Sequence, residues 1–288
     1  MARELTVAAL QTNHDWDHEA TVGRVLDLAR RAAREGARLI LPSELFETPY
    51  FCKARNPAYR DLARPAEGHP TIARFQDLAR EHAVVIPVSF YERAGERLYN
   101  AVAVVDADGE VLGIYRKCHI PDFEGYIETA YFEPSPDGAQ VWRTRYLTLG
   151  VGICWDQWFP ELARAMVLAG AELLVYPTAI GSEPVHSDWD TRDQWQTVMR
   201  GHAAANQIPV LAANRVGRET DDGITIDFYG GSFCVDQRAR DLVALDREPG
   251  IAMAIIDLDA AARDRRVWGA LRTRRPELYG ALTSKVNS

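Results

Sequence analysis

Apolar and polar positions in this 288-residue chain form two kinds of pattern, which follow one another along the sequence. Short runs of apolar residues bounded by turn residues are typical of buried strands. Such runs occupy residues 5–10, 38–42, 84–90, 147–153, 173–177, 209–213 and 251–256. Apolar residues at three- and four-residue spacing predict helices with one buried face. That spacing covers residues 21–35, 72–83, 160–169, 190–206 and 259–266. Strands that alternate with helices predict an α/β domain whose helices cover sheet faces.

Two hairpins interrupt this alternation. Residues 98–105 and 111–115 flank the turn Asp106-Ala107-Asp108-Gly109, and residues 232–235 and 242–245 form a second pair. Since no linker, repeat or low-complexity tract divides the chain, we expect a single domain over residues 1–266. The tail over residues 267–288, with five arginines between Arg265 and Arg275, is expected to pack on a neighbouring subunit or another element. A frayed end is the alternative.

Composition narrows the class of protein. The net charge is −8, with 47% hydrophobic and 26% charged residues, as in ordinary globular proteins. The negative charge argues against nucleic acid and favours a cationic or neutral ligand. No apolar run approaches the roughly 18 residues of a membrane span, and the N-terminus lacks the apolar core of a signal peptide. Four scattered cysteines without metal-binding spacing predict reduced thiols in the cytoplasm and no metal or organic cofactor.

Cys154 is predicted to lie in the turn between a buried strand and a helix. Cys154 follows a buried strand, and the Pro160-Glu161 pair soon afterwards starts a helix. Ligands of open α/β sheets bind at this carboxyl edge, and a sharp strand-to-helix turn can present a nucleophile beside free N–H groups. The alternative is that Cys154 is a small buried apolar residue.

Two more polar residues follow predicted strands. Glu44 comes after the strand at 38–42 in an aromatic run, and Lys117 comes after the second strand of the first hairpin. Taken alone, each could be an ordinary surface residue. Together with Cys154 they form a chemical set, in which a carboxylate takes the thiol proton and an ammonium stabilises the oxyanion. The backbone N–H of Trp155 is a candidate for the second oxyanion donor.

These segments resemble the motifs of the nitrilase superfamily of carbon–nitrogen hydrolases, which share a Glu-Lys-Cys triad. Glu44 in Leu-Pro-Ser-Glu-Leu, Lys117 in Tyr-Arg-Lys-Cys-His-Ile-Pro and Cys154 in Gly-Val-Gly-Ile-Cys-Trp-Asp match in order. The resemblance implies a four-layer α-β-β-α sandwich, and it implies that Glu128 is a second glutamate that orients the lysine and the substrate. It also implies homodimers that pair through helical faces, or larger homo-oligomers.

Within the superfamily, several segments resemble N-carbamoylputrescine amidases, among them residues 44–51, 119–122, 176–184 and 201–206. The resemblance implies hydrolysis of the ureido C–N bond of N-carbamoylputrescine through a cysteine thioester, giving putrescine, CO2 and ammonia. The small cationic carbamoyl-amine would then need an acidic partner for its ammonium. Glu183 is the implied partner, with Asp122 as a second candidate, and Tyr50 and Tyr126 would wall the butyl chain.

Other functions stay open at this point. An N-carbamoyl-amino-acid hydrolase, a β-ureidopropionase or an ω-amidase would bind a carboxylate and would need an arginine, for which Arg192 and Arg215 are candidates. A true nitrilase is a further member of the same superfamily. A catalytically inactive binding scaffold would be expected to lack a triad residue, and all three are present.

Overall fold

The first of two stacked sheets is built around the N-terminal strand. In this computed structural model of the protein, residues 3–184, 186 and 188–284 are described. Strand β1 pairs in parallel with β2 and antiparallel with β16. A bridge between Leu39 and Val85 extends this layer to a second group of three strands. The strands in spatial order are β16 (Gly250–Asp257), β1 (Glu4–Gln11), β2 (Leu39–Leu41), β3 (Ile86–Ala94), β4 (Arg97–Val105) and β5 (Val111–Arg116).

The second sheet has a parallel centre and antiparallel edges. Strands β9, β10 and β11 run parallel, as expected for strands joined by crossover helices. The spatial order is β15 (Asp241–Ala244), β14 (Phe233–Val235), β11 (Val210–Ala213), β10 (Leu173–Pro177), β9 (Thr148–Val151) and β8 (Val141–Arg143).

Alternation within single strands explains why both faces of each sheet are covered. In β1, Val7 and Ala9 belong to the core between the sheets, whereas Ala8 and Leu10 belong to the core under the first helix pair. In β10, Val175 faces the inter-sheet core and Leu174 faces the other helix pair. Strands buried on two sides are apolar throughout, which is why they appear in the sequence as continuous runs.

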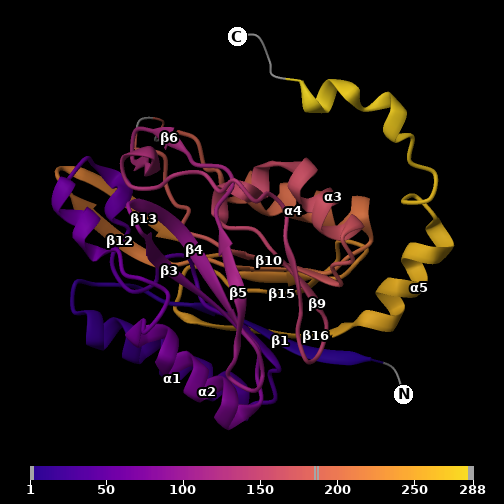
Figure 1. Ribbon diagram of the computed structural model, residues 1–288, viewed down its shortest axis with the longest axis horizontal. Coiled ribbons are helices and arrows are strands. Elements are labelled where there is room, and N and C mark those ends of the chain that lie inside the picture. Colours follow the sequence, from indigo (N-terminus) through magenta and orange to yellow (C-terminus); the bar gives the residue numbers. More distant parts are fainter. Residues whose placement is uncertain (1–2, 185, 187, 285–288) are drawn as a thin grey trace.

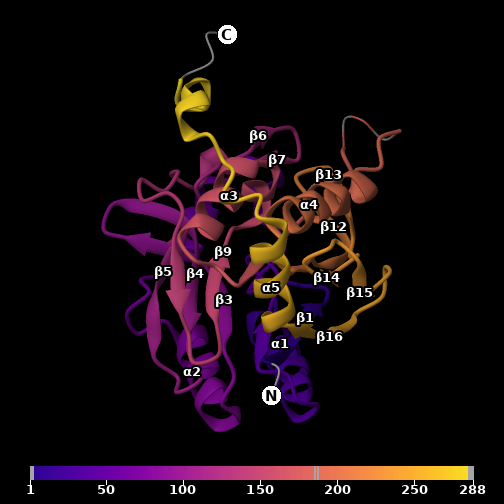
Figure 2. The same cartoon turned by 90° about the vertical axis from the view of Figure 1, so that its right-hand side faces the viewer.

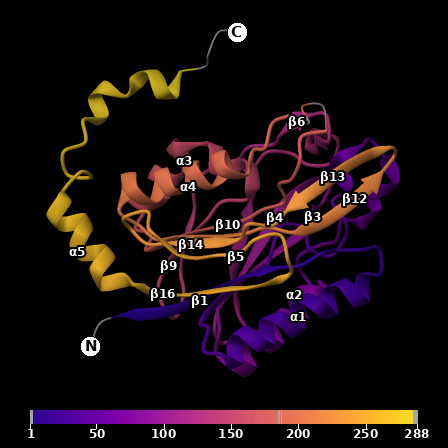
Figure 3. The ribbon, with the colours of Figure 1, turned by 180° about the vertical axis from the view of Figure 1, so that it is seen from behind.

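Two pairs of helices close the sandwich. Helices α1 (His18–Arg34) and α2 (Pro70–His82) cover one outer face, and α3 (Pro160–Leu168) and α4 (Arg192–Asn206) cover the other. Figures 1 and 3 show the two pairs on opposite sides of the sheets. The architecture is the predicted four-layer α-β-β-α sandwich.

One hairpin was not predicted from the sequence. Strands β12 (Val216–Asp221) and β13 (Ile224–Tyr229) pair through a turn at Asp222-Gly223, which is a strong hairpin signal. The antiparallel pairing of β3 with β4 was not predicted either, and three strands rather than two form this group. The irregular segment from residue 121 to 146 contains short strands, β6 (Asp122–Phe123), β7 (Tyr126–Ile127) and β8, with a single 3-10 turn at Glu128–Ala130.

The C-terminal segment leaves the sandwich at Leu258, which still packs in the core between the sheets. Helix α5 (Leu258–Trp268) is capped by Asp257, and the following chain runs past α3 and ends away from the sandwich (Figures 1 and 2). Large apolar side chains on it are exposed, namely Val267, Trp268, Leu278 and Leu282. Within the described residues, no helix combines the length and apolar character that crossing a membrane would require.

Candidate active site

Three strand ends bring the predicted triad together. Glu44 follows β2, Lys117 follows β5 and Cys154 follows β9. The Lys117 Nζ lies 2.9 Å from Glu44 Oε1 and 2.6 Å from Oε2 of Glu128. Cys154 and Glu128 line the same cavity. Residues separated by up to 110 positions therefore form one cluster.

The lysine of this cluster stays charged although it has no exposed surface. Burial lowers the pKa of Lys117, but the carboxylates of Glu128 and Glu44 outweigh that effect and raise the pKa well above its usual value. An ammonium held between two carboxylates is a fixed positive charge in a site of low dielectric constant. Such a charge can stabilise an oxyanion without reorganisation.

One carboxylate oxygen of Glu44 accepts hydrogen bonds, and the other has no partner among the described residues. Oε1 accepts hydrogen bonds from Asn100 Nδ2 at 2.6 Å and from Lys117 Nζ. Oε2 is buried and has no hydrogen-bond partner among the described residues. A buried acceptor without a partner is costly, and this oxygen is therefore available to accept a proton.

Glu128 has both of its oxygens engaged. Oε2 binds Lys117, and Oε1 accepts a hydrogen bond from the Tyr50 hydroxyl at 2.8 Å. Burial raises the pKa of Glu128 to about 7, and the neighbouring charge of Glu44 adds to the rise while Lys117 opposes it. Glu128 therefore titrates near neutral pH.

The backbone at Cys154 forms a tight elbow. Cys154 has φ +40° and starts a 3-10 helix that extends to Trp158, so the N–H groups of its first turn, including that of Trp155, lack partners within that helix. Gly152 is required just before the elbow, because a Cβ there would lie 2.7 Å from the Tyr176 ring. The elbow thus presents a thiol beside backbone donors, as a nucleophile turn requires.

The thiol of Cys154 needs a base. Its side chain is 5% exposed, and its Sγ lies 3.8 Å from the Ala179 carbonyl oxygen. Burial raises the pKa of Cys154 well above its usual value, with the charge of Glu44 adding to the rise and Lys117 opposing it. The resting group is therefore a neutral thiol, and attack requires a partner that removes its proton.

Asp156 joins the elbow to the segment that carries the lysine. Its Oδ2 accepts hydrogen bonds from Ile153 N at 2.9 Å and from the Tyr115 hydroxyl at 2.7 Å. Its Oδ1 accepts from the backbone N–H groups of Cys118 and His119. One buried carboxylate therefore sets the distance between the two chain segments.

A cavity of about 370 Å³ opens onto Cys154. Two predicted substrate residues, Tyr126 and Glu183, line it. Glu183 is partly buried, and burial raises its pKa. The remaining lining residues were not predicted from the sequence as substrate contacts, and Phe123 is one of them. The other lining residues are Pro121, Trp155, Trp158, Ala179, Ile180, His186, Trp189, Thr191 and Gln194.

Two predicted substrate residues lie elsewhere. Tyr50 has no exposed surface, and its ring packs against that of Tyr126. Its hydroxyl donates a hydrogen bond to Glu128. Asp122 is half exposed on β6, with an oxygen 3.8 Å from Arg55. Neither is among the described residues that line the cavity.

Both candidate arginines for a substrate carboxylate are engaged with other groups. Arg192 binds Asp246 at 2.8 Å and the Leu245 carbonyl. Arg215 is fully buried and binds Glu219 and backbone carbonyls. Among the described lining residues there is no arginine or lysine, and His186 is the only residue of a basic type.

The fold and the cluster define a class of enzyme, and the comparisons with known proteins agree. The family model described as carbon-nitrogen hydrolase matches residues 6–266, so the chain belongs to that family and is a carbon–nitrogen hydrolase. This confirms the class that the three motifs predicted, in place of an inactive scaffold.

Named relatives are similar over nearly the whole chain. N-carbamoylputrescine amidase of Solanum lycopersicum is 50% identical, over 97% of this chain and 95% of that protein. Citrullinase of Francisella tularensis is 46% identical, over 98% and 99%. The solved structure of a carbon-nitrogen hydrolase from Helicobacter pylori G27 has a TM-score of 0.92 at 36% identity, covering 98% of this chain and 99% of that one. A variant of an amidase from Nesterenkonia AN1, of the nitrilase superfamily, has a TM-score of 0.78 at 25% identity, over 96% and 97%.

Proposed function

We propose that this enzyme hydrolyses the ureido C–N bond of N-carbamoylputrescine to putrescine, CO2 and ammonia. The observation that carries the proposal is the charge of the cavity. A carboxylate, Glu183, lies among aromatic residues in the cavity that holds Cys154, and no arginine or lysine is among the described lining residues. A diamine derivative with one free ammonium fits this pattern. The plant relatives with that activity, at about 50% identity, support it.

In the first half of the reaction, the Cys154 sulfur attacks the ureido carbonyl carbon. Glu44 accepts the thiol proton on its free oxygen and passes it to the departing ammonia. Lys117 and the N–H of Trp155 stabilise the oxyanion of the tetrahedral intermediate, and Glu128 holds Lys117 in place. The product of this half is an alkylcarbamoyl thioester on Cys154.

In the second half, Glu44 activates a water molecule that attacks the thioester carbonyl. Cys154 leaves and regains its proton from Glu44, and the released alkylcarbamate decomposes to CO2 and putrescine. This sequence uses only groups of the chain and water.

Within the cavity, Glu183 binds the ammonium of the substrate. Trp155, Trp158 and Tyr126 enclose the butyl chain, and aromatic faces also favour a cation. A charge pair sheltered from water discriminates strongly, because a substrate without the ammonium leaves the carboxylate unpaired.

Citrulline is the second candidate substrate, because the citrullinase relative is 46% identical. Citrulline equals N-carbamoylputrescine with a carboxylate on the carbon that bears the amine. That carboxylate would need a cation beside Glu183, and His186 is the nearest candidate among the described lining residues. A buried carboxylate pair without a strong cation is unfavourable, so we favour the amine without a carboxylate.

A substrate panel tests the proposal. Purified enzyme is assayed for ammonia release from N-carbamoylputrescine, citrulline, N-carbamoyl-β-alanine, a linear amide and a nitrile. We expect the highest kcat/KM with N-carbamoylputrescine, by at least about 100-fold over citrulline, since one unpaired buried charge costs about 3 kcal/mol or more. A preference for citrulline would contradict the assignment of the amine, while leaving the hydrolase class intact.

The pH profile tests the role of Glu128. Donation from the Tyr50 hydroxyl favours the ionised form and lowers the pKa of Glu128. Tyr50→Phe is therefore expected to raise that pKa above about 7, and the acid limb of the kcat profile should move to higher pH. Tyr91→Phe is a matched control, because the Tyr91 hydroxyl donates to the Tyr131 carbonyl oxygen instead of a carboxylate. An unmoved limb in Tyr50→Phe would argue against a titrating Glu128.

We also propose that the chain forms a homodimer or larger homo-oligomer through the outer face of α3 and α4, with the tail covering a second copy. A groove of about 1030 Å³ lies between these helices and the tail, and Leu168, Leu278 and Leu282 line it or stand exposed beside it. Exposed apolar groups of this extent support an interface. Sedimentation of the full chain should give at least a dimer. Deletion of residues 270–288 should lower the number of copies in the assembly or raise its dissociation constant.

A further inference from the structure

We propose that the buried ion pair of Arg215 and Glu219 is a positioning device that holds the general base and the Tyr50–Glu128 contact in working geometry. The proposal rests on the role of Glu44 proposed above. Arg215 lies directly before β12 and Glu219 within it, in the hairpin that the sequence analysis overlooked. Neither residue belongs to the triad or lines the substrate cavity.

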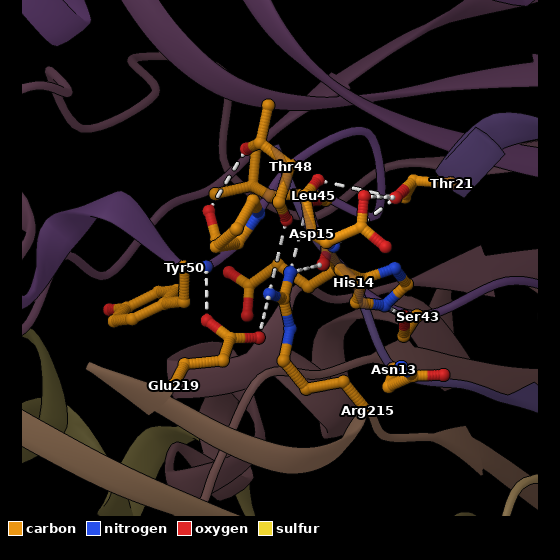
Figure 4. A network of polar contacts seen from close by, with 12 residues as sticks. Asn13, His14, Asp15, Thr21, Ser43, Leu45, Thr48, Tyr50, Arg215 and Glu219 are labelled. Carbon is orange, nitrogen blue, oxygen red and sulfur yellow. Dashed lines mark hydrogen bonds and ion pairs between the residues drawn. The ribbon is translucent and has the colours of Figure 1, made fainter. Parts of the chain in front are cut away.

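The guanidinium of Arg215 binds the backbone of Glu44 and of the turn that follows it. One terminal nitrogen donates to the carbonyl oxygens of Glu44 at 2.7 Å and Leu45 at 2.9 Å. The other donates to the Thr48 carbonyl oxygen at 3.2 Å and to Glu219 Oε1 at 2.9 Å. Figure 4 shows the Arg215 guanidinium together with Leu45, Thr48 and Glu219. Arg215 has no exposed surface, so its charge acts entirely inside the protein.

The turn that Arg215 binds needs support. Leu45 has φ +45°, a conformation that costs free energy for a residue with a side chain. The carbonyls of Glu44 and Leu45 are buried with their residues, and buried carbonyls require donors. A single guanidinium supplies donors to both, and it thereby keeps the residue after Glu44 in the strained conformation that directs the carboxylate at Lys117.

Glu219 extends the same device to the other side of the cluster. Its Oε2 accepts a hydrogen bond from Tyr50 N at 2.6 Å and an ion-pair contact from Lys53 Nζ at 3.3 Å. The hydroxyl of Tyr50 in turn reaches Glu128, which binds Lys117. One ion pair therefore determines the position of the Glu44 backbone and of the tyrosine that contacts Glu128.

Asn214, directly before Arg215, binds the backbone of another loop of the site. Asn214 Oδ1 accepts from Ile180 N at 3.0 Å, and its Nδ2 donates to the Ile180 carbonyl oxygen at 2.8 Å. Ile180 lines the substrate cavity. Two consecutive side chains after β11 therefore bind two different loops of the site. This arrangement indicates that Arg215 positions site residues and does not only stabilise its own hairpin.

Arginine is suited to this position by its geometry. Its planar fork can serve several acceptors at fixed angles, whereas a lysine ammonium is a point charge on a flexible stem. Arg215→Lys keeps the charge beside Glu219 but cannot reach the Glu44, Leu45 and Thr48 carbonyls together. The variant therefore separates charge from positioning.

The test compares kcat and KM of Arg215→Lys with those of the wild type, each normalised to the folded fraction measured by circular dichroism. We expect kcat to fall by about 100-fold, because misplacement of a catalytic group by about 1 Å has effects of this size. KM should change by less than about threefold, since the substrate cavity is untouched. Alkylation of Cys154 by iodoacetamide should slow in parallel, because the thiol loses its base.

Matched variants keep the result interpretable. Arg200→Lys is the control, because Arg200 also forms a paired contact with a carboxylate, Asp241, but lies on α4 away from the triad. It should keep wild-type kcat. If Arg215→Lys does not fold, Glu219→Gln decides, since it keeps the shape of the side chain and leaves one mismatched contact with Arg215, Tyr50 or Lys53. Its kcat should fall more than its KM changes.

Wild-type kcat per folded molecule in Arg215→Lys, or in Glu219→Gln where the first does not fold, would overturn the proposal and leave a purely structural pair. Glu44→Gln is measured in parallel to separate this failure from failure of the proposed function. An active Glu44→Gln would refute the role of Glu44 itself. An inactive Glu44→Gln beside a fully active Arg215→Lys would refute only the positioning role.

Discussion

Replacement of Cys154 by alanine is expected to abolish ammonia release while leaving the fold intact. The proposed mechanism depends on one sulfur nucleophile. Without that sulfur no thioester can form, so kcat should fall by at least about 10⁴-fold. The change removes one atom from a residue that is 5% exposed, so the loss of packing is small. Ammonia release by the purified variant, together with its circular dichroism and thermal unfolding, measures both effects.

The control for this experiment is Cys234→Ala, because Cys234 is a free cysteine buried in the core between the sheets, on β14 and away from the cavity. It should lose stability more than activity. If Cys154→Ala kept more than about 1% of wild-type turnover, a thioester mechanism would be untenable.

Replacement of Glu183 by glutamine is expected to have a large effect on substrate choice. The carboxylate is partly buried among aromatic residues, so its loss should raise KM for N-carbamoylputrescine by about 10- to 100-fold. The KM of a neutral N-alkylurea of the same length should change by less than about threefold. Steady-state kinetics with both substrates measure the difference.

The pH dependence gives a second readout for the same residue. Burial raises the pKa of Glu183, so the carboxylate becomes protonated at a higher pH than an exposed glutamate does. In the wild type, KM for the cationic substrate should therefore rise as the pH falls through that raised value, and in Glu183→Gln it should not. Glu124→Gln is the control, since Glu124 is exposed in the loop that carries Phe123. Equal losses for charged and neutral substrates would remove Glu183 as the amine partner.

The fold was largely accessible to sequence reasoning because its strands and helices have strong local patterns. Runs such as residues 173–177 are apolar on both sides of the strand, which local sequence reports directly. The β12–β13 hairpin escaped, although Asp222-Gly223 was a usable signal, because its strands mix charged and apolar residues. Such strands lie partly outside the main sheets and lack the continuous apolar run of a buried strand.

The site was accessible in part. Glu44, Lys117 and Cys154 could be grouped because each stands at a strand end, and their cluster is present. The wall residues Trp158 and Trp189 could not be assigned, since one ends a short 3-10 helix and the other lies in a loop, and local sequence does not determine the direction of either segment. Tyr50 was predicted to contact substrate, and its position beneath Tyr126 depends on how separate loops pack.

The pattern of the sequence determined an α/β domain with helices on its sheet faces and the set of reactive groups, because periodicity reports which faces are buried and residue type reports chemistry. The four-layer α-β-β-α order came from the resemblance of the three motifs to the nitrilase superfamily. Only the tertiary structure decided which groups touch. It left Oε2 of Glu44 without a partner among the described residues, turned Tyr50 toward Glu128, and enclosed Arg215 as an internal support in place of a substrate anchor. The physical reason is distance along the chain: contacts such as that between Glu44 and Arg215 join residues 171 positions apart, and close packing of complete layers selects them.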